Sequence, residues 1–303
     1  MGALLEFQDI CQKRIVTNFA KQILKESYSE CIPAHKALIG EFVDEVFLLL
    51  DTSYDNSDVF SRNLEELRVR LFHNQKESFW FNHHYGRYKQ LFKPQYRVQG
   101  LENLSIGPKI LDFGCGKGAT SVALSEKGYQ VFLVDEIDYR DQSVKHLPFF
   151  KITEDNVLPF PDSFFDEVIV FGVLHHVETY RLEALLSEIA RVSRRIIVEE
   201  DVYSSTTTLD SVTQKTSYDE QLLSYENLTP ENQKNYLEFL DYYANIIVQG
   251  IENMNMPLAF RTIQEWQIVF EKQGLFVVDL IPKGFQKHYF HRSNHFWFEL
   301  AKH

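Results

Sequence analysis

The sequence predicts an α/β fold built around a parallel sheet with helices on both faces. From residue 109 onward, short β-branched or aromatic runs alternate with helical segments, which is the pattern of successive βαβ units. A glycine-rich turn follows the first of these runs, at the place where such sheets bind nucleotides. The segment 201–261 interrupts the alternation with polar residues and helical spacing.

Seven strand candidates and several helices follow one another in this region. The strand candidates are KILDF (109–113), QVFLVD (130–135), FFKIT (149–153), DEVIVF (166–171), RRIIVEE (194–200), LFVVDLI (275–281) and HFWFEL (295–300). A helix over 179–193 carries apolar residues at i, i+3, i+4, i+7 and i+10. Thr229 before Pro230, and Thr262 three residues before Glu265, are start signals for two more helices.

The N-terminal part of the chain is predicted to be helical. Apolar residues recur at helical spacing over residues 1–75, and the pattern changes only at residue 109. We therefore expect a helical N-terminal cap over 1–90. A ligand-binding domain is expected over 91–303, with the helical insert 201–261 inside it.

Composition and charge disfavour several classes of protein. The chain has 303 residues, of which 44% are hydrophobic, enough for a full core. Its formal net charge of −12 repels phosphate backbones, so a nucleic-acid partner is not expected. The longest apolar run, VFLLL, is far below membrane-spanning length, and no leader pattern is expected. Three widely spaced cysteines indicate reduced thiols and a cytoplasmic protein.

The glycine-rich turn reads KILDFGCGKGATS over residues 109–121. Its glycines let backbone N–H groups approach a ligand closely, but their spacing differs from the G-x-G-x-x-G of dinucleotide-binding folds. Asp112 lies two residues before Gly114, where a carboxylate repels a pyrophosphate and suits an ammonium group. Asp135 ends the next strand and is placed to bind both ribose hydroxyls of an adenosine. The pair indicates an adenosine joined to a cationic amino-acid tail, which fits S-adenosylmethionine better than NAD or ATP.

Three passages carry a further signal: ILDFGCGKGATS, VFLVDEID and, at 158–177, LPFPDSFFDEVIVFGVLHHV. They resemble the class I S-adenosylmethionine-dependent methyltransferases, and within them the type-11 group of quinone-biosynthesis and natural-product enzymes. FRTIQEWQIVFEKQGLFVVDL at 260–280 is similar to the late helix and sixth strand of that family. The resemblance covers about residues 88–303 apart from the insert. It implies a three-layer, doubly wound, Rossmann-like sheet of seven mostly parallel strands, the last one antiparallel.

The resemblance also implies cofactor contacts, residue by residue. Asp112, Gly114 and Gly116 are expected to line the methionine part of S-adenosyl-L-methionine, and Cys115 between them is also expected to contact the cofactor. Asp135 would bind the ribose, and Glu136 would lie near the adenine. The product of transfer would be S-adenosyl-L-homocysteine.

Two places depart from the pattern of the relatives. An Asp-Ala pair that meets the adenine in relatives is replaced here by Glu154 and Asp155, either of which can accept from the adenine amino group. The stretch ARVSRRIIVEE lacks the usual Pro-Gly-Gly turn before the fifth strand. Phe171 and Gly172, which end the fourth strand, keep the family positions that border the sulfonium and its methyl group.

The segment FWFNHHYGRYKQLF at 79–92 resembles the aromatic helix that closes over the cofactor in relatives. Arg87 is expected to pair with the methionine carboxylate, and Tyr88 to contact the cofactor. Tyr85 is expected to contact the substrate. The alternative for Arg87 is a solvated position on a helix face.

The chemistry needs an aligned acceptor and, for a protonated acceptor, a base. His175 and His176 follow the fourth strand, and by family position they lie nearest the reacting methyl. One of them is predicted to face the substrate, with packing as the alternative. Glu200 is a third catalytic candidate and Asp201 a substrate contact, because ligands of open α/β sheets bind at the carboxyl ends of the strands.

The remaining substrate candidates lie in the insert and near the C-terminus. Tyr243 belongs to an acidic, tyrosine-rich insert, a combination that suits a cationic or amine-bearing acceptor; the alternative is a solvated lid. His291 and Arg292 are predicted to form part of the pocket wall. His288, His291 and His295 are expected in loop and strand, which disperses them, so we expect no metal.

Together these observations predict methyl transfer to a small molecule through an N, O or C atom. The alternative is a catalytically silent S-adenosylmethionine-binding partner or sensor, and a third interpretation is an NAD-linked reductase. The protein is expected to be a monomer or a homodimer.

Overall fold

The computed structural model describes residues 2–51, 57–74, 76–153, 156–204, 217–251 and 254–302. The chain divides into two compact units, each made from three stretches. The sheet unit comprises Lys89–Asp201, Arg261–Lys283 and His295–His303. The helical unit comprises Met1–Tyr88, Val202–Phe260 and Gly284–Asn294. The helical insert therefore groups with the N-terminal helices rather than with the sheet.

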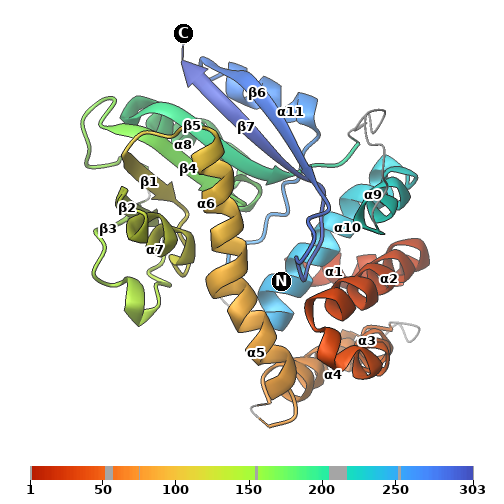
Figure 1. Cartoon of the computed structure of the whole chain (residues 1–303). Coiled ribbons are helices and arrows are strands. Elements are labelled where there is room, and N and C mark those ends of the chain that lie inside the picture. The colour runs from red at the N-terminus through yellow and green to blue at the C-terminus, as the bar shows by residue number, and fades with distance from the viewer. Residues whose placement is uncertain are drawn as a thin grey trace. The chain divides into compact units, whose positions relative to one another are not determined.

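The described part of the sheet unit is organised around seven strands (Figure 1). They are β1 (Lys109–Phe113), β2 (Gln130–Asp135), β3 (Phe149–Lys151), β4 (Phe165–Phe171), β5 (Ser193–Asp201), β6 (Leu275–Gly284) and β7 (His295–Lys302). Their spatial order is β3-β2-β1-β4-β5-β7-β6. Strands β1 to β5 pair in parallel, and β7 pairs antiparallel with β5. The predicted sheet and its antiparallel last strand are confirmed.

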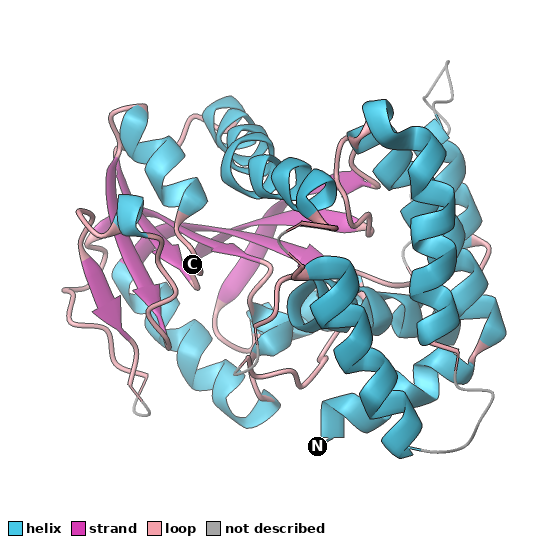
Figure 2. Ribbon diagram, turned by 90° about the horizontal axis from the view of Figure 1, so that it is seen from below, coloured by secondary structure: helices cyan, strands magenta, loops and turns pink. Residues whose placement is uncertain are grey.

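Helices lie on both faces of this sheet (Figure 2). The longer ones are α6 (Lys93–Asn103), α7 (Ala119–Glu126), α8 (Thr179–Val192) and α11 (Ile263–Glu271). A π-helical segment, η3 (Tyr88–Phe92), precedes α6, and η4 (Gln142–Val144) and η5 (Leu174–His176) are short 3-10 helices. Helix α6 packs on α7. It also approaches β7 so closely that a Cβ on Gly100 would lie 2.5 Å from the Trp297 ring. Helix α8 passes directly into β5, which explains how the chain dispenses with a turn there.

The core of the sheet unit is formed by buried apolar residues from the strands and from α6 and α7. Its members include Val98, Leu101, Ile110, Leu124, Leu133, Ile169, Ile197 and Trp297. Because both faces of a parallel sheet are covered, its strands are almost continuously apolar. This is why β1 and β4 were recognisable from composition alone.

The helical unit contains α1 (Gly2–Gln12), α2 (Arg14–Cys31), η1 (Pro33–His35), α3 (Lys36–Leu49), α4 (Ser57–Glu66), α5 (Phe79–Arg87), α9 (Ser217–Glu226) and α10 (Pro230–Tyr242). Two π-helical segments, η2 (Leu67–Phe72) and η6 (Tyr243–Val248), continue α4 and α10. Thr229 caps α10 by accepting the N–H of Asn232, as predicted. The described helices include none with the length and apolar character that a membrane span requires.

Candidate cofactor site

The glycine-rich turn between β1 and α7 leaves room for a ligand. Gly114, Gly116 and Gly118 have φ angles of +71°, +53° and +79°, a region that glycine adopts without steric cost. A Cβ on Gly114 would lie 2.4 Å from Val173 Cγ2, whereas a Cβ on Gly116 would meet no atom within 4 Å. Gly114 is therefore required by packing, and Gly116 keeps one side of the turn open.

Asp135 holds this turn from the end of β2. Its Oδ2 atom accepts the N–H of Gly116 at 2.8 Å, and its Oδ1 atom accepts the N–H of Ile137 at 3.4 Å. Burial raises the pKa of the Asp135 carboxyl, although the Gly116 N–H opposes the shift. Glu136 next to it is exposed and pairs with Arg181 at 2.6 Å. Asp135, the residue predicted to bind the ribose, is thus hydrogen-bonded to the turn, and Glu136 lies in solvent.

Asp112 lies in β1 with only 4% of its surface exposed. Its Oδ2 atom accepts the hydroxyl of Ser121, in α7, at 2.5 Å. Burial raises the pKa of the Asp112 carboxyl to about 6, against the opposing effects of the Ser121 bond and the Arg97 charge. A bound cation would favour the ionised carboxylate, so Asp112 has the properties that an ammonium-binding group needs.

A cluster of cationic side chains, which sequence reasoning missed, lies near the turn. Lys89, Lys93 and Arg97 follow one another at intervals of four residues in η3 and α6. Burial, together with the charges of Lys93, Arg97 and Lys117, lowers the pKa of Lys89 well below its usual value. The i, i+4, i+8 spacing, which places side chains on one helix face, was the signal available in the sequence.

Arg97 connects this cluster to the end of β5. It forms a short ion pair with Glu199 and lies over the Phe171 ring at 4.9 Å. Glu199 also accepts the indole N–H of Trp297 at 2.8 Å. Although burial opposes it, the Arg97 charge holds the pKa of Glu199 well below the usual range. Phe171, predicted to border the sulfonium, is thus fixed by a cation on its ring and by Trp297, whose ring stacks on it at 5.2 Å.

The two histidines after β4 have different surroundings. His175 is buried, and its Nδ1 atom lies 2.6 Å from Glu200 Oε2. Glu200 is fully buried, and its Oε1 atom accepts the N–H groups of Val173 at 3.1 Å and Leu174 at 2.7 Å. His176 is half-buried, with its ring 4.1 Å from that of His175. Glu200 therefore ties β5 to the turn after β4 and orients one imidazole.

The remaining site residues predicted in the sheet unit lie at the carboxyl ends of the strands or are not among the described residues. Gly172 has a φ of +68° and donates its N–H to the Glu199 carbonyl at 2.8 Å. Asp201 faces His295 across the β5–β7 ladder, and their side chains are paired at 2.5 Å. Cys115 is half-buried, and burial raises the pKa of its thiol. Glu154 and Asp155 are not among the described residues.

The helical unit holds the other predicted contacts. The aromatic candidates Tyr85, Tyr88 and Tyr243 are buried. Arg87 is exposed. The Tyr28 hydroxyl lies 3.3 Å from the Tyr243 hydroxyl and 3.0 Å from His291 Nε2.

Arg292 has internal partners in the same unit. It is fully buried, and it donates to Gln221 and to Glu30, both at 2.7 Å. The predicted roles of all these residues toward cofactor and substrate stay predictions.

Comparison of the sequence with models of known protein families gives one match. Residues 111–195 match the family model described as a methyltransferase domain. This segment contains the glycine turn, Asp135 and the His175–Glu178 stretch after β4. Residues 111–195 therefore form a methyltransferase domain of the type-11 family. Its cofactor is accordingly S-adenosylmethionine, and the open side of Gly116 with the carboxylates of Asp112 and Asp135 fits that molecule. No curated protein matches the methyltransferase in sequence.

Among solved structures, the methyltransferase is similar to several proteins at low identity. An S-adenosylmethionine-dependent methyltransferase from Archaeoglobus fulgidus has 13% identity and a TM-score of 0.45, with 75% of this chain and 100% of that chain covered. The 1,6-didemethyltoxoflavin-N1-methyltransferase of Burkholderia thailandensis has 13% identity, a TM-score of 0.45, and coverages of 83% and 92%. The magnesium protoporphyrin IX methyltransferase of Synechocystis PCC 6803 has 16% identity, a TM-score of 0.44, and coverages of 82% and 97%. Similarities at this level carry over no substrate.

Proposed function

We propose that this methyltransferase modifies a small molecule through an atom that loses a proton, with an amine as the preferred acceptor. The observation that carries the proposal is the buried hydrogen bond between His175 Nδ1 and Glu200. A carboxylate at Nδ1 fixes the tautomer in which Nε2 is the accepting nitrogen. An imidazole held in this way is a suitable base at neutral pH.

The cofactor, when bound, supplies an electrophilic methyl group on a sulfonium. The chain has to orient the acceptor, exclude water and receive its proton, and alignment alone is worth roughly 7–11 kcal/mol. We assign the proton to His175 or to His176 beside it. Glu200 is then a positioning residue, because its oxygens are occupied by His175 and by two backbone N–H groups.

The charge of the chain supports a small and cationic acceptor. A net charge of −12 disfavours a nucleic-acid substrate. The same negative field attracts amines. We further propose that the protein is cytoplasmic and acts as a monomer or homodimer.

The proposal is tested by measuring S-adenosylhomocysteine formation with matched acceptors, an aromatic amine, a phenol and a carbon acid of similar size. The expected result is turnover with the amine above the acceptor-free rate. His175→Gln should lower that turnover, and the matched control His146→Gln, at an exposed position, should not. Cofactor binding without turnover of any acceptor would instead favour the silent cofactor-binding protein.

A further inference from the structure

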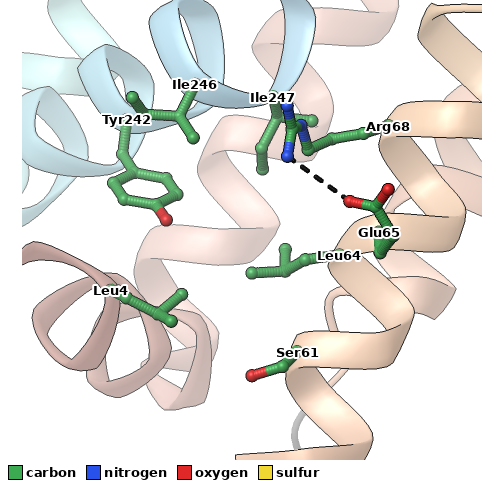
Figure 3. A pocket seen from close by; sticks show the side chains of 8 residues that line it. All are labelled: Leu4, Ser61, Leu64, Glu65, Arg68, Tyr242, Ile246 and Ile247. Carbon is green, nitrogen blue, oxygen red and sulfur yellow. Dashed lines mark hydrogen bonds and ion pairs between the residues drawn. The ribbon is translucent and has the colours of Figure 1, made fainter. Parts of the chain in front are cut away.

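A pocket lies entirely within the helical unit, between α1, α4, η2, α10 and η6 (Figure 3). Its volume is about 170 Å³. The residues that line it are Leu4, Ser61, Leu64, Glu65, Arg68, Tyr242, Ile246 and Ile247. A cavity of about 150 Å³ is known to hold a benzene molecule. The pocket is therefore large enough for a ring or a short branched chain with one polar group.

The polar atoms around the pocket are mainly hydrogen-bond donors. Tyr242 is 8% exposed, and Figure 3 shows its hydroxyl pointing into the space between the helices. Neither this hydroxyl nor that of Ser61 bonds to a described residue. Burial raises the pKa of Tyr242, against the opposing charge of Arg68, so the phenol keeps its proton. The Tyr242 hydroxyl can therefore donate to a ligand oxygen in the pocket.

Arg68 and Glu65 are the charged residues of the lining. The Arg68 guanidinium lies 3.4 Å from the Glu65 carboxylate, with 22% of the Arg68 side chain and 63% of the Glu65 side chain exposed. The contact is long and the Glu65 carboxylate is mostly exposed, so this pair contributes little to stability. A ligand carboxylate can instead form two parallel bonds with the same guanidinium. Because Glu65 lies mostly in water and Arg68 does not, the pocket favours an anion over a cation.

The backbone around the pocket is unusual on two sides. Arg68 belongs to the π-helical segment η2, and Ile246 and Ile247 belong to the π-helical segment η6. These two segments pack against each other. Single π-helical turns are rare and occur frequently at functional sites. Two of them at one pocket are a separate indication that the local geometry serves a ligand.

We propose that this pocket binds a small carboxylate with a compact aromatic or branched aliphatic body. The carboxylate binds Arg68 and the Tyr242 hydroxyl, and the body packs on Leu4, Leu64 and Ile246. The site is distinct from the cofactor turn, because none of its residues belongs to the sheet unit. The inference does not depend on the acceptor proposed above.

The test uses the full chain saturated with S-adenosylhomocysteine, and titration calorimetry with benzoate, benzyl alcohol and benzylamine. Benzoate is expected to bind more tightly than benzyl alcohol, and benzylamine is expected not to bind. Arg68→Gln should weaken benzoate binding about tenfold, the effect of one charge-assisted bond. The matched control Arg62→Gln, at an exposed position of the same helix that does not line the pocket, should leave it unchanged.

Ser61→Phe provides a second test that does not depend on whether Arg68→Gln folds. Ser61 is exposed at the pocket rim, so Ser61→Phe should preserve the fold, checked by its melting temperature, and should abolish benzoate binding. Absence of benzoate binding to the parent protein would overturn the proposal. So would tighter binding of benzylamine, or a benzoate affinity that neither Arg68→Gln nor Ser61→Phe changes.

Discussion

The predicted binding of the cofactor ammonium by Asp112 implies that cofactor affinity depends on pH. Burial raises the pKa of the Asp112 carboxyl to about 6, and a methionine ammonium bound by Asp112 would require the ionised carboxylate. A carboxyl with this pKa is about nine-tenths ionised at pH 7 and about one-tenth ionised at pH 5. Because the apparent affinity scales with the competent fraction, the dissociation constant should rise about tenfold between pH 7 and pH 5.

The assay is titration calorimetry with S-adenosylhomocysteine at pH 5, 6 and 7 and constant ionic strength. Asp112→Asn is the matched variant, since it keeps the size and the Ser121 partner but cannot ionise. It should bind more weakly at pH 7 and should show no tenfold change between pH 7 and pH 5. The reasoning is refuted if the parent protein has a flat profile, or if Asp112→Asn retains the same slope.

Three further variants test the turns at the site. Gly114→Ala should lose about 1–3 kcal/mol of unfolding free energy in urea, because residue 114 has a left-handed conformation and its new Cβ would collide with Val173. Equal stability of Gly114→Ala and Gly116→Ala would contradict this. Glu200→Gln keeps one oxygen that can accept the N–H groups of Val173 and Leu174, but it replaces the oxygen facing His175 with an amide NH2, so it should lose about 1–3 kcal/mol in the same assay; an unchanged midpoint would count against that role. His176→Gln should lower kcat with an unchanged cofactor dissociation constant; a change in the dissociation constant alone would place His176 in cofactor binding.

The sheet could be predicted because its physical signals are local. Strands covered on both faces are short apolar runs, and the capping box of Thr262 and Glu265 marks the start of α11 through contacts three residues apart. The grouping of the insert with the N-terminal helices could not be predicted, because it depends on contacts such as Lys13 with Asn235 that lie more than two hundred residues apart.

The glycine-rich turn between β1 and α7 was predictable for the same reason, and the contacts of its neighbours were not. The spacing of Asp112, Gly114 and Gly116 is a property of one short stretch. By contrast, nothing in the sequence shows that Glu200 accepts N–H groups from the turn after β4. The position of Arg97 between Glu199 and Phe171 likewise arises from packing of α6 on the sheet.

The central claim is that the turn after β1, with Asp135, holds the adenosine and methionine parts of S-adenosylmethionine. The most direct measurement compares S-adenosylhomocysteine with NADH by calorimetry, on the parent protein and on Asp135→Ala. The expected result is one bound S-adenosylhomocysteine per parent chain and no binding of NADH. Asp135→Ala should bind S-adenosylhomocysteine at least about tenfold more weakly, because it loses a charge-assisted hydrogen bond. Binding of NADH without binding of S-adenosylhomocysteine would contradict the central claim.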